Sequence, residues 1–545
     1  MINSMRYIST RRIFKDSLTI KSIFTMLVLG LIVGCSKECP VLSVEGGQIQ
    51  GVPADISGVY VFRGIPYAAP PIHELRWKAP QPVVPWEGIR LCDKFGRPGF
   101  QHTQFRGGYY TEWGYGDESP YSEDCLYLNV WTRRPGCVDA NLPVILWIHG
   151  GGCREGFGSE PEFDGQEFAA KDVVLVSINY RLGVFGFLAH PELSAESGHN
   201  ASANYGILDQ IQSLKWVRDN IAQFGGNPNN VTIAGQSAGG GCVRILCESP
   251  LARGLFHKAV IMSAGGLSPL PEVQPNDRVI DDQNVDDGIE RIAAYHAPVP
   301  PAGLTEFQRA EFNSKVIMDW AGYTSLEKMR AASTEAIFTV AEIYNSATGN
   351  FPIINGMSLV NGYRHPIVDG YASTESFDAA AVDGTLADVP YLIGYTMNDY
   401  REMSDEIVNF CINREKNGSK AWAYEFARPL PDDNSHPEAR KAHQESTSEN
   451  SALTVLQGAF HSSDLWYVFK SMKHSWRPWT KGDWELSERM ITAWANFARY
   501  GDPNGSDEGE WTPCTESNPR MMIFKLDKMD NDVSEMGVHI AELKY

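Results

Sequence analysis

The chain has 545 residues, more than one hydrophobic core requires, and large α/β enzymes reach this size by inserting long loops into a single sheet. Hydrophobic residues make up 43% of the chain and charged residues 21%, which is the composition of a globular protein. The formal net charge of −20 argues against a nucleic-acid partner, because nucleic-acid binding depends on neutralising phosphates with cationic side chains.

The first residues have the pattern of an export signal. Five lysine and arginine side chains precede the apolar run SIFTMLVLGLIVG, which is too short to span a membrane comfortably. The ending IVGC resembles a bacterial lipobox, and this resemblance implies cleavage before Cys35 and lipidation of its thiol. We therefore expect a signal peptide over residues 1–34, a tether over 35–44, and an exported lipoprotein that acyl chains anchor to the cell envelope, at its periplasmic face or at the cell surface. An ordinary signal peptide with a chance cysteine is the alternative.

From residue 45 to residue 545 the pattern has no long linker or internal repeat, which indicates a single domain. VYVFRGIPYAAPP is typical of a strand that runs into a proline-rich loop. The apolar runs in residues 142–152 (LPVILWIHGGG) and 172–183 (DVVLVSINYRLG) are typical of strands buried on both faces. Helical spacing follows in residues 208–226, and NVTIAG and LFHKAVIMSAG predict two more strands. This alternation indicates a parallel sheet covered on both faces.

The apolar periodicity weakens from about residue 266 to residue 380. This stretch begins polar and turn-rich and contains two helical segments, FNSKVIMDWAG and SLEKMRAASTEAIFTVAEIY. We interpret it as an insertion that caps the C-terminal edge of the sheet, where folds of this kind bind ligands. Residues 389–396 return to a strand pattern, and residues 486–504 predict a long helix.

The stretch VTIAGQSAGGGC places Ser237 in a sharp turn between a strand and a helix. Gly235 and Gly239 flank the serine where side chains would collide, and such a turn holds the hydroxyl over the sheet in a strained conformation. A serine hydroxyl becomes a nucleophile when a base takes its proton and donors stabilise the oxyanion. We interpret Ser237 as a nucleophile and the N–H of Ala238, at the helix N-terminus, as one such donor. A surface glycine turn is the alternative.

The sequence His149-Gly150-Gly151-Gly152 directly follows a predicted buried strand. Successive glycines let the backbone approach a substrate and aim N–H groups at one point. We therefore predict an oxyanion hole formed by the N–H groups of Gly151, Gly152 and Ala238. His149 itself is interpreted as a residue that packs or fixes the loop.

A base and an acid are expected after the serine, in the order Ser, acid, His. His461 lies between the apolar segments VLQGAF and SSDLWYVF, whereas His436 and His443 lie in a polar stretch. We therefore favour His461 as the base. Asp399 follows the strand of residues 389–396, where a carboxylate can reach a histidine Nδ1–H. Glu402 and Asp405 are the alternative acids.

These stretches together resemble the type-B carboxylesterases, a group that also includes cholinesterases, bile-salt-activated lipases and bacterial esterases. The resemblance covers roughly residues 45–545, and its segments include FRGIPYAAPP, SEDCLYLNVW, VILWIHGGG, SINYRLGVFGFL, GQSAGG, AFHSSDLWYVF and WANFARYGDPN. It implies an α/β-hydrolase fold with a mostly parallel central sheet and helices on both faces. It also implies no cofactor, and hydrolysis of a small-molecule ester through an acyl-enzyme.

The resemblance also assigns roles to single residues. It implies Ser237 as nucleophile, His461 as base and Asp399 as acid, although most members carry glutamate at the acid position. Ser263 matches a serine that hydrogen-bonds near the acid–histidine pair, and Ser462 replaces a glycine that often follows the histidine.

Two structural ion pairs and one cysteine also match the family. The resemblance implies ion pairs between Arg76 and Glu123 and between Arg181 and Asp209. Cys125 matches a cysteine that is disulfide-bonded in animal members, but Gly99 stands about where its partner should be. We favour a free Cys125, with a bond to Cys92 as the alternative.

The other cysteines give little support to metal binding. The ten cysteines form no CxxC pair and no zinc-like cluster with histidine, so we expect no metal site. Cys242 and Cys247 are interpreted as buried apolar residues. One or two disulfides remain possible in an exported protein.

Three functions are weighed from these observations. We favour a serine carboxylesterase; a feruloyl or acetyl esterase on plant polysaccharide, or a lipase, is the alternative, and a non-catalytic binding module of the same fold is the third. Trp113, Tyr115 and Tyr121 are interpreted as gorge lining or packing. Acyl and alcohol preferences depend on residues 102–121 and 266–380, and the sequence does not indicate an oligomeric state.

Overall fold

The computed structural model describes residues 39–101, 121–267, 301–346, 353–354, 357–358, 366–399, 401–431, 458–506, 509–526 and 538–542. The predicted signal peptide, Cys35, Trp113 and Tyr115 lie outside these ranges. The chain divides into two units, Met1–Cys39 and Pro40–Tyr545, and the fold that follows is that of the second. Within the described ranges, no helix combines the length and the apolar character that crossing a bilayer requires.

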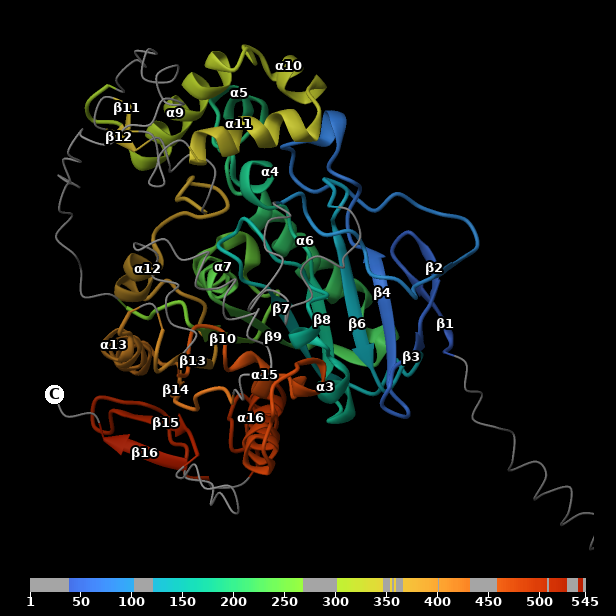
Figure 1. The fold of residues 1–545 in the computed structure, drawn as a ribbon, viewed down its shortest axis with the longest axis vertical. Coiled ribbons are helices and arrows are strands. Elements are labelled where there is room, and N and C mark those ends of the chain that lie inside the picture. Colours follow the sequence, from blue (N-terminus) through green and yellow to red (C-terminus); the bar gives the residue numbers. More distant parts are fainter. Residues whose placement is uncertain are drawn as a thin grey trace, which may run out of the picture. The chain divides into compact units, whose positions relative to one another are not determined.

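An 11-stranded sheet forms the centre of the fold, in the order β16-β15-β14-β13-β10-β9-β7-β8-β6-β4-β3 (Figure 1). The strands from β15 to β8 in this order pair in parallel, whereas β16 at one edge and β6, β4 and β3 at the other pair antiparallel. The strands are β3 (Val52–Pro53), β4 (Tyr60–Pro66), β6 (Tyr127–Thr132), β7 (Leu142–Ile148), β8 (Val174–Ile178), β9 (Gly226–Gln236), β10 (Lys258–Met262), β13 (Tyr391–Thr396), β14 (Ala421–Phe426), β15 (Arg520–Phe524) and β16 (Val538–Glu542). This confirms the predicted mostly parallel sheet.

The central strands are those that the apolar runs predict. Strands β8 and β10 are buried at every residue, and β7 is buried at all but its first, as expected for parallel strands with helices on both faces. The β-branched and aromatic residues of these runs favour extended backbone.

Two small sheets accompany the central one. Strands β1 (Val41–Val44), β2 (Gly47–Gln50) and β5 (Ile89–Leu91) form the first, and β11 (Ile353–Ile354) and β12 (Met357–Ser358) form the second. The predicted tether over residues 35–44 is therefore wrong for Val41–Val44. Leu42 pairs with Ile49 and both side chains are buried, so this short segment belongs to the folded domain.

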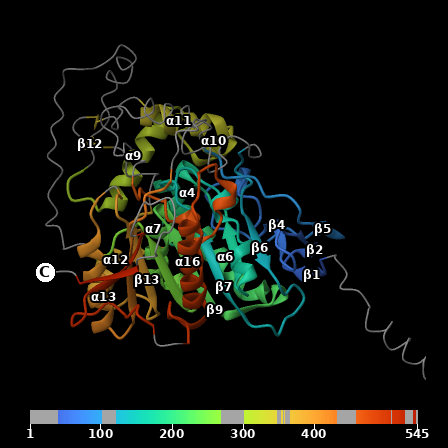
Figure 2. The same ribbon diagram turned by 60° about the horizontal axis from the view of Figure 1, so that its bottom comes forward.

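Helices cover both faces of the central sheet (Figures 1 and 2). On one face, α3 (Gln166–Ala170), α15 (Leu465–Val468) and α16 (Lys481–Tyr500) share a core with the strands. On the other, α6 (Tyr205–Asn220) and α7 (Ala238–Glu248) pack on β9 and on each other. Helix α16 begins with a capping box formed by Thr480 and Asp483 and ends at Gly501, whose φ of 73° is unstrained for glycine.

The described part of the predicted insertion contains β11, β12 and several helices, and its two predicted helical segments are confirmed. Helices α9 (Glu306–Trp320), α10 (Leu326–Ala331) and α11 (Thr334–Ser346) pack against α4 (Gly183–Phe187), α5 (Pro191–Glu196) and the 3-10 helix η1 (His73–Leu75). Figure 1 shows them grouped around α5 and above α4, the two helices that follow the C-terminal end of β8.

The predicted C-terminal boundary of that insertion, at about residue 380, falls in helix α12 (Phe377–Asp383). This helix packs on α7 and on α13 (Ser404–Lys416), in the layer that covers the sheet.

Short 3-10 helices complete the described elements. They are η2 (Pro161–Phe163), η3 (Ile221–Phe224), η4 (Pro250–Ala252) and η6 (Met472–His474). The predicted helix of residues 208–226 thus ends as η3, at Gly225 with φ 79°.

Candidate active site

Ser237 stands between β9 and α7, at the C-terminal edge of the sheet. Its backbone has φ 57° and ψ −126°, a conformation that is strained for a residue with a side chain. An ideal Cβ on Gly239 would lie 2.1 Å from the carbonyl oxygen of Ile148, and one on Gly235 would lie 2.5 Å from Gly239. Both flanking glycines are therefore required by space, as the sequence predicts.

The glycine loop after β7 lies against this turn. An ideal Cβ on Gly150 would lie 3.1 Å from the Cβ of Ser237, so the two segments are in contact. Gly151 and Gly152 have φ values of 86° and 62°, which glycine adopts without strain. The N–H of Ala238 is in the first turn of α7, where it has no acceptor within the helix. The predicted donors thus come from two adjoining segments.

His149 is buried and stacks on Tyr180, with ring centroids 4.5 Å apart. Its Nδ1 lies 3.0 Å from the carbonyl oxygen of Gly150, and burial lowers the pKa of its imidazole to about 4. These contacts confirm His149 as a residue that packs and fixes the loop.

Asp399 and His461 are joined by a short hydrogen bond. Nδ1 of His461 lies 2.7 Å from Oδ1 of Asp399, and the hydroxyl of Thr396 donates to Oδ2 of the same carboxylate at 3.1 Å. Because a carboxylate accepts, Nδ1 carries the proton in the neutral imidazole and Nε2 is left as the basic nitrogen. The alternative acid Glu402 instead hydrogen-bonds Tyr395.

Gln236 brings this pair to the serine turn. Its amide Nε2 lies 3.3 Å from Nε2 of His461, and Gln236 immediately precedes Ser237. Gln236 was not predicted to lie here, because nothing in a single chain marks the residue before the predicted nucleophile as a neighbour of the histidine.

Asn398 fixes the acid loop to the histidine loop. Its backbone N–H donates to the carbonyl oxygen of Ala459 at 2.9 Å, and its side-chain oxygen accepts from the N–H of Ala459 at 2.9 Å. Asn398 also forms an isolated parallel bridge with Phe460. Residues 399 and 461 are therefore held side by side by the residues that precede them. This role of Asn398 was not predicted from the sequence.

Expectations were also stated for two serines near the Asp399–His461 pair, Ser462 and Ser263. Ser462 has a φ of 74°, which explains why glycine is favoured at this position. Ser263 is buried, but within the described residues its hydroxyl has no hydrogen-bond partner. The expected hydrogen bond from Ser263 to the acid–histidine pair is therefore not found.

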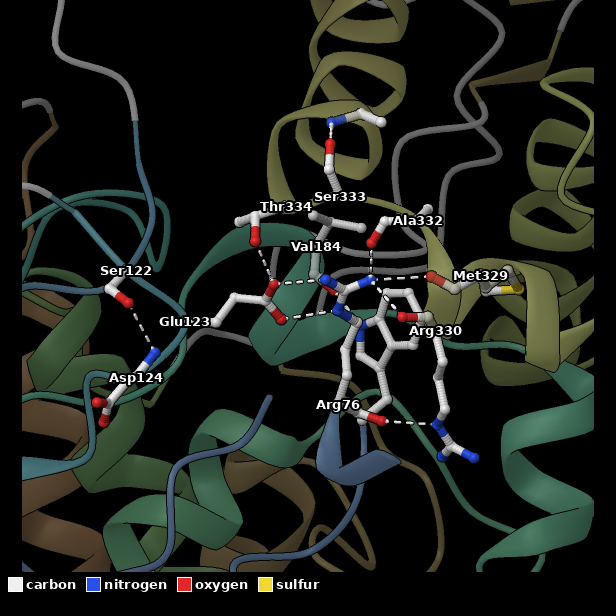
Figure 3. Close-up of polar contacts among 12 residues, drawn as sticks. Arg76, Ser122, Glu123, Asp124, Val184, Met329, Arg330, Ala332, Ser333 and Thr334 are labelled. Atoms are coloured by element: carbon white, nitrogen blue, oxygen red, sulfur yellow. Dashed lines mark hydrogen bonds and ion pairs between the residues drawn. The ribbon is translucent and has the colours of Figure 1, made fainter. Parts of the chain in front are cut away.

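The predicted ion pair of Arg76 and Glu123 is present and buried (Figure 3). Its two hydrogen bonds measure 2.8 and 2.6 Å. Nη1 of Arg76 also donates to carbonyl oxygens near the end of α10, those of Met329, Arg330 and Ala332. Thr334, the first residue of α11, donates its hydroxyl to Glu123 at 2.6 Å. The pair thus fastens α10 and α11 to the rest of the domain.

The second predicted ion pair, Arg181 with Asp209, is also present. Asp209 accepts from the backbone N–H, Nε and Nη2 of Arg181 at 3.0, 2.8 and 2.6 Å. The remaining Nη1 donates to the carbonyl oxygen of Lys78 at 2.8 Å. The N–H of Gly183, two residues after Arg181, donates to the carbonyl oxygen of Cys153 in the glycine loop. This ion pair therefore braces the loop beside the site.

Among the described residues, seven free thiols are Cys125, Cys137, Cys153, Cys242, Cys247, Cys411 and Cys514, and all but Cys137 are buried. The free thiol of Cys125 confirms its preferred interpretation. Cys242 and Cys247 are buried as expected, in α7.

Comparisons with known proteins identify the family of this chain and agree with its fold. The family model described as the carboxylesterase family matches residues 38–409 and 402–541. Fumonisin B1 esterase of Sphingopyxis macrogoltabida is 30% identical over 519 residues, which cover 88% of this chain and 85% of that protein. Para-nitrobenzyl esterase of Bacillus subtilis is 28% identical, over 90% of this chain and 96% of that protein.

A solved structure agrees. The carboxylesterase EST55 of Geobacillus stearothermophilus superposes with a TM-score of 0.66 at 25% identity, covering 92% of this chain and 97% of that one. This likeness supports the α/β-hydrolase fold along almost the whole chain. The chain belongs to the carboxylesterase family and is a serine hydrolase of carboxylic esters.

Proposed function

We propose that Ser237, His461 and Asp399 form the catalytic triad of this esterase. The observation that carries the proposal is the 2.7 Å contact of Asp399 with Nδ1 of His461, which leaves Nε2 as a base next to the residue that precedes Ser237. The buried carboxylate fixes the tautomer and stabilises the imidazolium that forms during the reaction.

The proposed reaction has two steps, acylation of Ser237 and deacylation by water. His461 takes the Ser237 proton as Oγ attacks the ester carbonyl, and the N–H groups of Gly151, Gly152 and Ala238 stabilise the oxyanion. The imidazolium then gives its proton to the leaving alcohol, and the acyl group stays on Oγ. Water, deprotonated by the same imidazole, attacks the acyl-enzyme and releases the carboxylic acid, and Oγ recovers its proton.

Replacing the nucleophile tests the proposal. Ser237→Ala is expected to lower kcat for p-nitrophenyl esters by roughly 10⁶-fold and to abolish labelling by a fluorophosphonate probe. Ser57→Ala, at an exposed serine in the loop between β3 and β4, is the control and should keep both. Activity or labelling that survives in Ser237→Ala would refute the assignment, and absent labelling of the wild-type chain would favour a binding module.

The substrate is proposed to be a small-molecule ester, in line with the names of fumonisin B1 esterase and para-nitrobenzyl esterase. A panel of p-nitrophenyl esters with short, long and aromatic acyl groups, compared with feruloylated and acetylated polysaccharide and with triglyceride, separates this proposal from its alternatives. Preference for a polymer or an emulsified lipid would replace it.

The chain is further proposed to be an exported lipoprotein anchored at Cys35. The cationic start, the apolar run and the cysteine after Gly34 support this. Expression in a bacterium with labelled palmitate should label the wild-type chain and Cys39→Ser but not Cys35→Ser. Labelling of Cys35→Ser, or an unlabelled wild-type chain with a mature N-terminus elsewhere, would refute the anchor.

A further inference from the structure

The small sheet β1-β2-β5 exposes an apolar face to solvent. Residues paired across strands, and residues two apart along a strand, lie on the same face of a sheet. By this rule the outer face consists of two rows of paired residues, Val41 with Gln50 and Leu91, and Ser43 with Gln48 and Ile89. Val41, Ile89 and Leu91 are 41%, 54% and 55% exposed, whereas Leu42 and Ile49 on the opposite face are 2% and 0% exposed.

This outer face carries no charge and has a tryptophan at its side. None of its six residues is ionisable, although the chain has a formal net charge of −20. The partly exposed Trp86 donates its indole N–H to the carbonyl oxygen of Gln48 at 2.9 Å, and Val84 in the same loop is 61% exposed. Grouped exposed apolar side chains mark a surface that binds a protein or a membrane, and tryptophan is favoured where an apolar layer meets water.

The outer face lies where the chain enters the folded domain. Val41 is the first residue of β1 and stands six residues after Cys35, the proposed site of lipid attachment. Six residues span at most roughly 20 Å even when fully extended. A domain as long as Pro40–Tyr545 is on the order of 60 Å across. A lipid on Cys35 therefore keeps this side of the domain close to the bilayer.

The same face is remote from the ester site. Only Gly51 separates β2 from β3, the edge strand of the central sheet. Ser237 follows β9, and β7, β8, β6 and β4 lie between β9 and that edge. Figures 1 and 2 both show β1 and β2 on one side of the domain and α12 on the other. Contact between the outer face and a bilayer therefore leaves Ser237 away from the lipid.

We propose that the outer face docks on the lipid bilayer to which Cys35 anchors the chain, with Val41, Ile89 and Leu91 in contact with lipid. The proposal rests on the lipid anchor proposed above. Because the anchor holds the face at a high local concentration, a few apolar side chains suffice to keep it on the membrane. The absence of charge on the face also avoids repulsion by anionic lipids. A second copy of the chain suits the face less well, because the edge strand β5 has only 3 residues for pairing.

A fluorophore on the outer face tests the proposal. The full lipidated chain is purified from bacterial membranes and placed in vesicles of phosphatidylethanolamine and phosphatidylglycerol that contain doxyl-labelled lipid, a contact quencher. NBD is attached through Gln48→Cys, in a Cys137→Ser background because Cys137 is an exposed thiol. The control carries NBD through Val382→Cys, at a 55% exposed position of α12. We expect several-fold stronger quenching at residue 48 than at residue 382.

Paired replacements then separate docking from mere proximity to the anchor. Ile89→Ser with Leu91→Ser removes apolar side chains from the face and should reduce the quenching at residue 48. Val368→Ser with Val382→Ser removes exposed valines outside the face and should leave that quenching unchanged. Hydrolysis of a p-nitrophenyl ester in detergent shows that each variant is folded.

The outcomes distinguish this inference from the anchor itself. In a chain that labelled palmitate marks, equal quenching at residues 48 and 382 overturns the inference and leaves the anchor intact. Quenching that Ile89→Ser with Leu91→Ser does not change overturns it as well. So does a dimer in detergent whose NBD at residue 48 escapes quenching in vesicles, because a second copy then covers the face. A wild-type chain without palmitate, whose mature N-terminus lies elsewhere, overturns the anchor and this inference with it.

Discussion

Replacing Asp209 with alanine should strongly destabilise the protein. The side chains of Arg181 and Asp209 are only 2% and 0% exposed. In Asp209→Ala, the guanidinium keeps its bond to the carbonyl oxygen of Lys78 but loses its counter-ion, and the backbone N–H of Arg181 loses its acceptor. An uncompensated buried charge of this kind costs about 3–5 kcal/mol of unfolding free energy.

An exposed ion pair on helix α6, which also contains Asp209, provides the control. Arg218 and Asp219 form an ion pair on the same helix, but their side chains are 52% and 56% exposed. Asp219→Ala should therefore change the unfolding free energy by no more than about 1 kcal/mol. Urea unfolding followed by tryptophan fluorescence measures both variants.

The double variant Arg181→Met with Asp209→Leu loses the whole ion pair without leaving a charge unpaired. It therefore separates the effect of losing the ion pair on stability from the effect of an unpaired buried charge. Because apolar residues of similar volume replace buried ion pairs at little cost, it should recover most of the stability lost in Asp209→Ala. Equal losses in Asp209→Ala and Asp219→Ala would refute the reasoning. The reasoning would also be refuted if the double variant lost as much unfolding free energy as its two single variants lose together.

Three further predictions concern the site. Gly239→Ala places a Cβ 2.1 Å from the carbonyl oxygen of Ile148 and should lower both kcat and the urea midpoint, whereas Gly241→Ala, whose Cβ meets nothing within 4 Å, should lower neither. Asn398→Ala removes one of the two hydrogen bonds that align the acid and histidine loops, and should reduce kcat on the order of 10²-fold with KM and urea midpoint nearly unchanged. His149 has a pKa of about 4 in the folded protein against 6.5 when unfolded, so the unfolded state binds more protons between these values. Unfolding free energy should therefore fall by roughly 3 kcal/mol on acidification from pH 6.5 to 4, and His149→Phe should flatten that fall; an equally steep fall in the variant would contradict the assignment.

The central strands and the serine turn were predicted well, because the residues that determine each of them lie within the same short segment of the sequence. Strands β7 and β8 are continuous apolar runs, and Gly235 and Gly239 mark the turn by their spacing. The contact between Asp399 and His461 agrees with the pairing that was predicted from chain order and from the segments that flank the two residues. These features need no knowledge of distant segments.

The residues that were missed depend on contacts between distant segments. Asn398 and Ala459 are 61 residues apart, and Gln236 and His461 are 225 apart. Strand β1 looked like a tether because its alternating pattern is four residues long and its apolar face is defined only by pairing with β2. No local pattern indicates such partners.

The way in which Arg76 holds α10 has a consequence for variation among related chains. Its guanidinium binds three main-chain oxygens, a group that every residue possesses. Mutations that exchange the side chains at those positions leave the acceptors in place. The attachment therefore tolerates sequence drift in α10, and libraries that randomise this helix can keep its docking as long as Arg76 and Glu123 stay fixed.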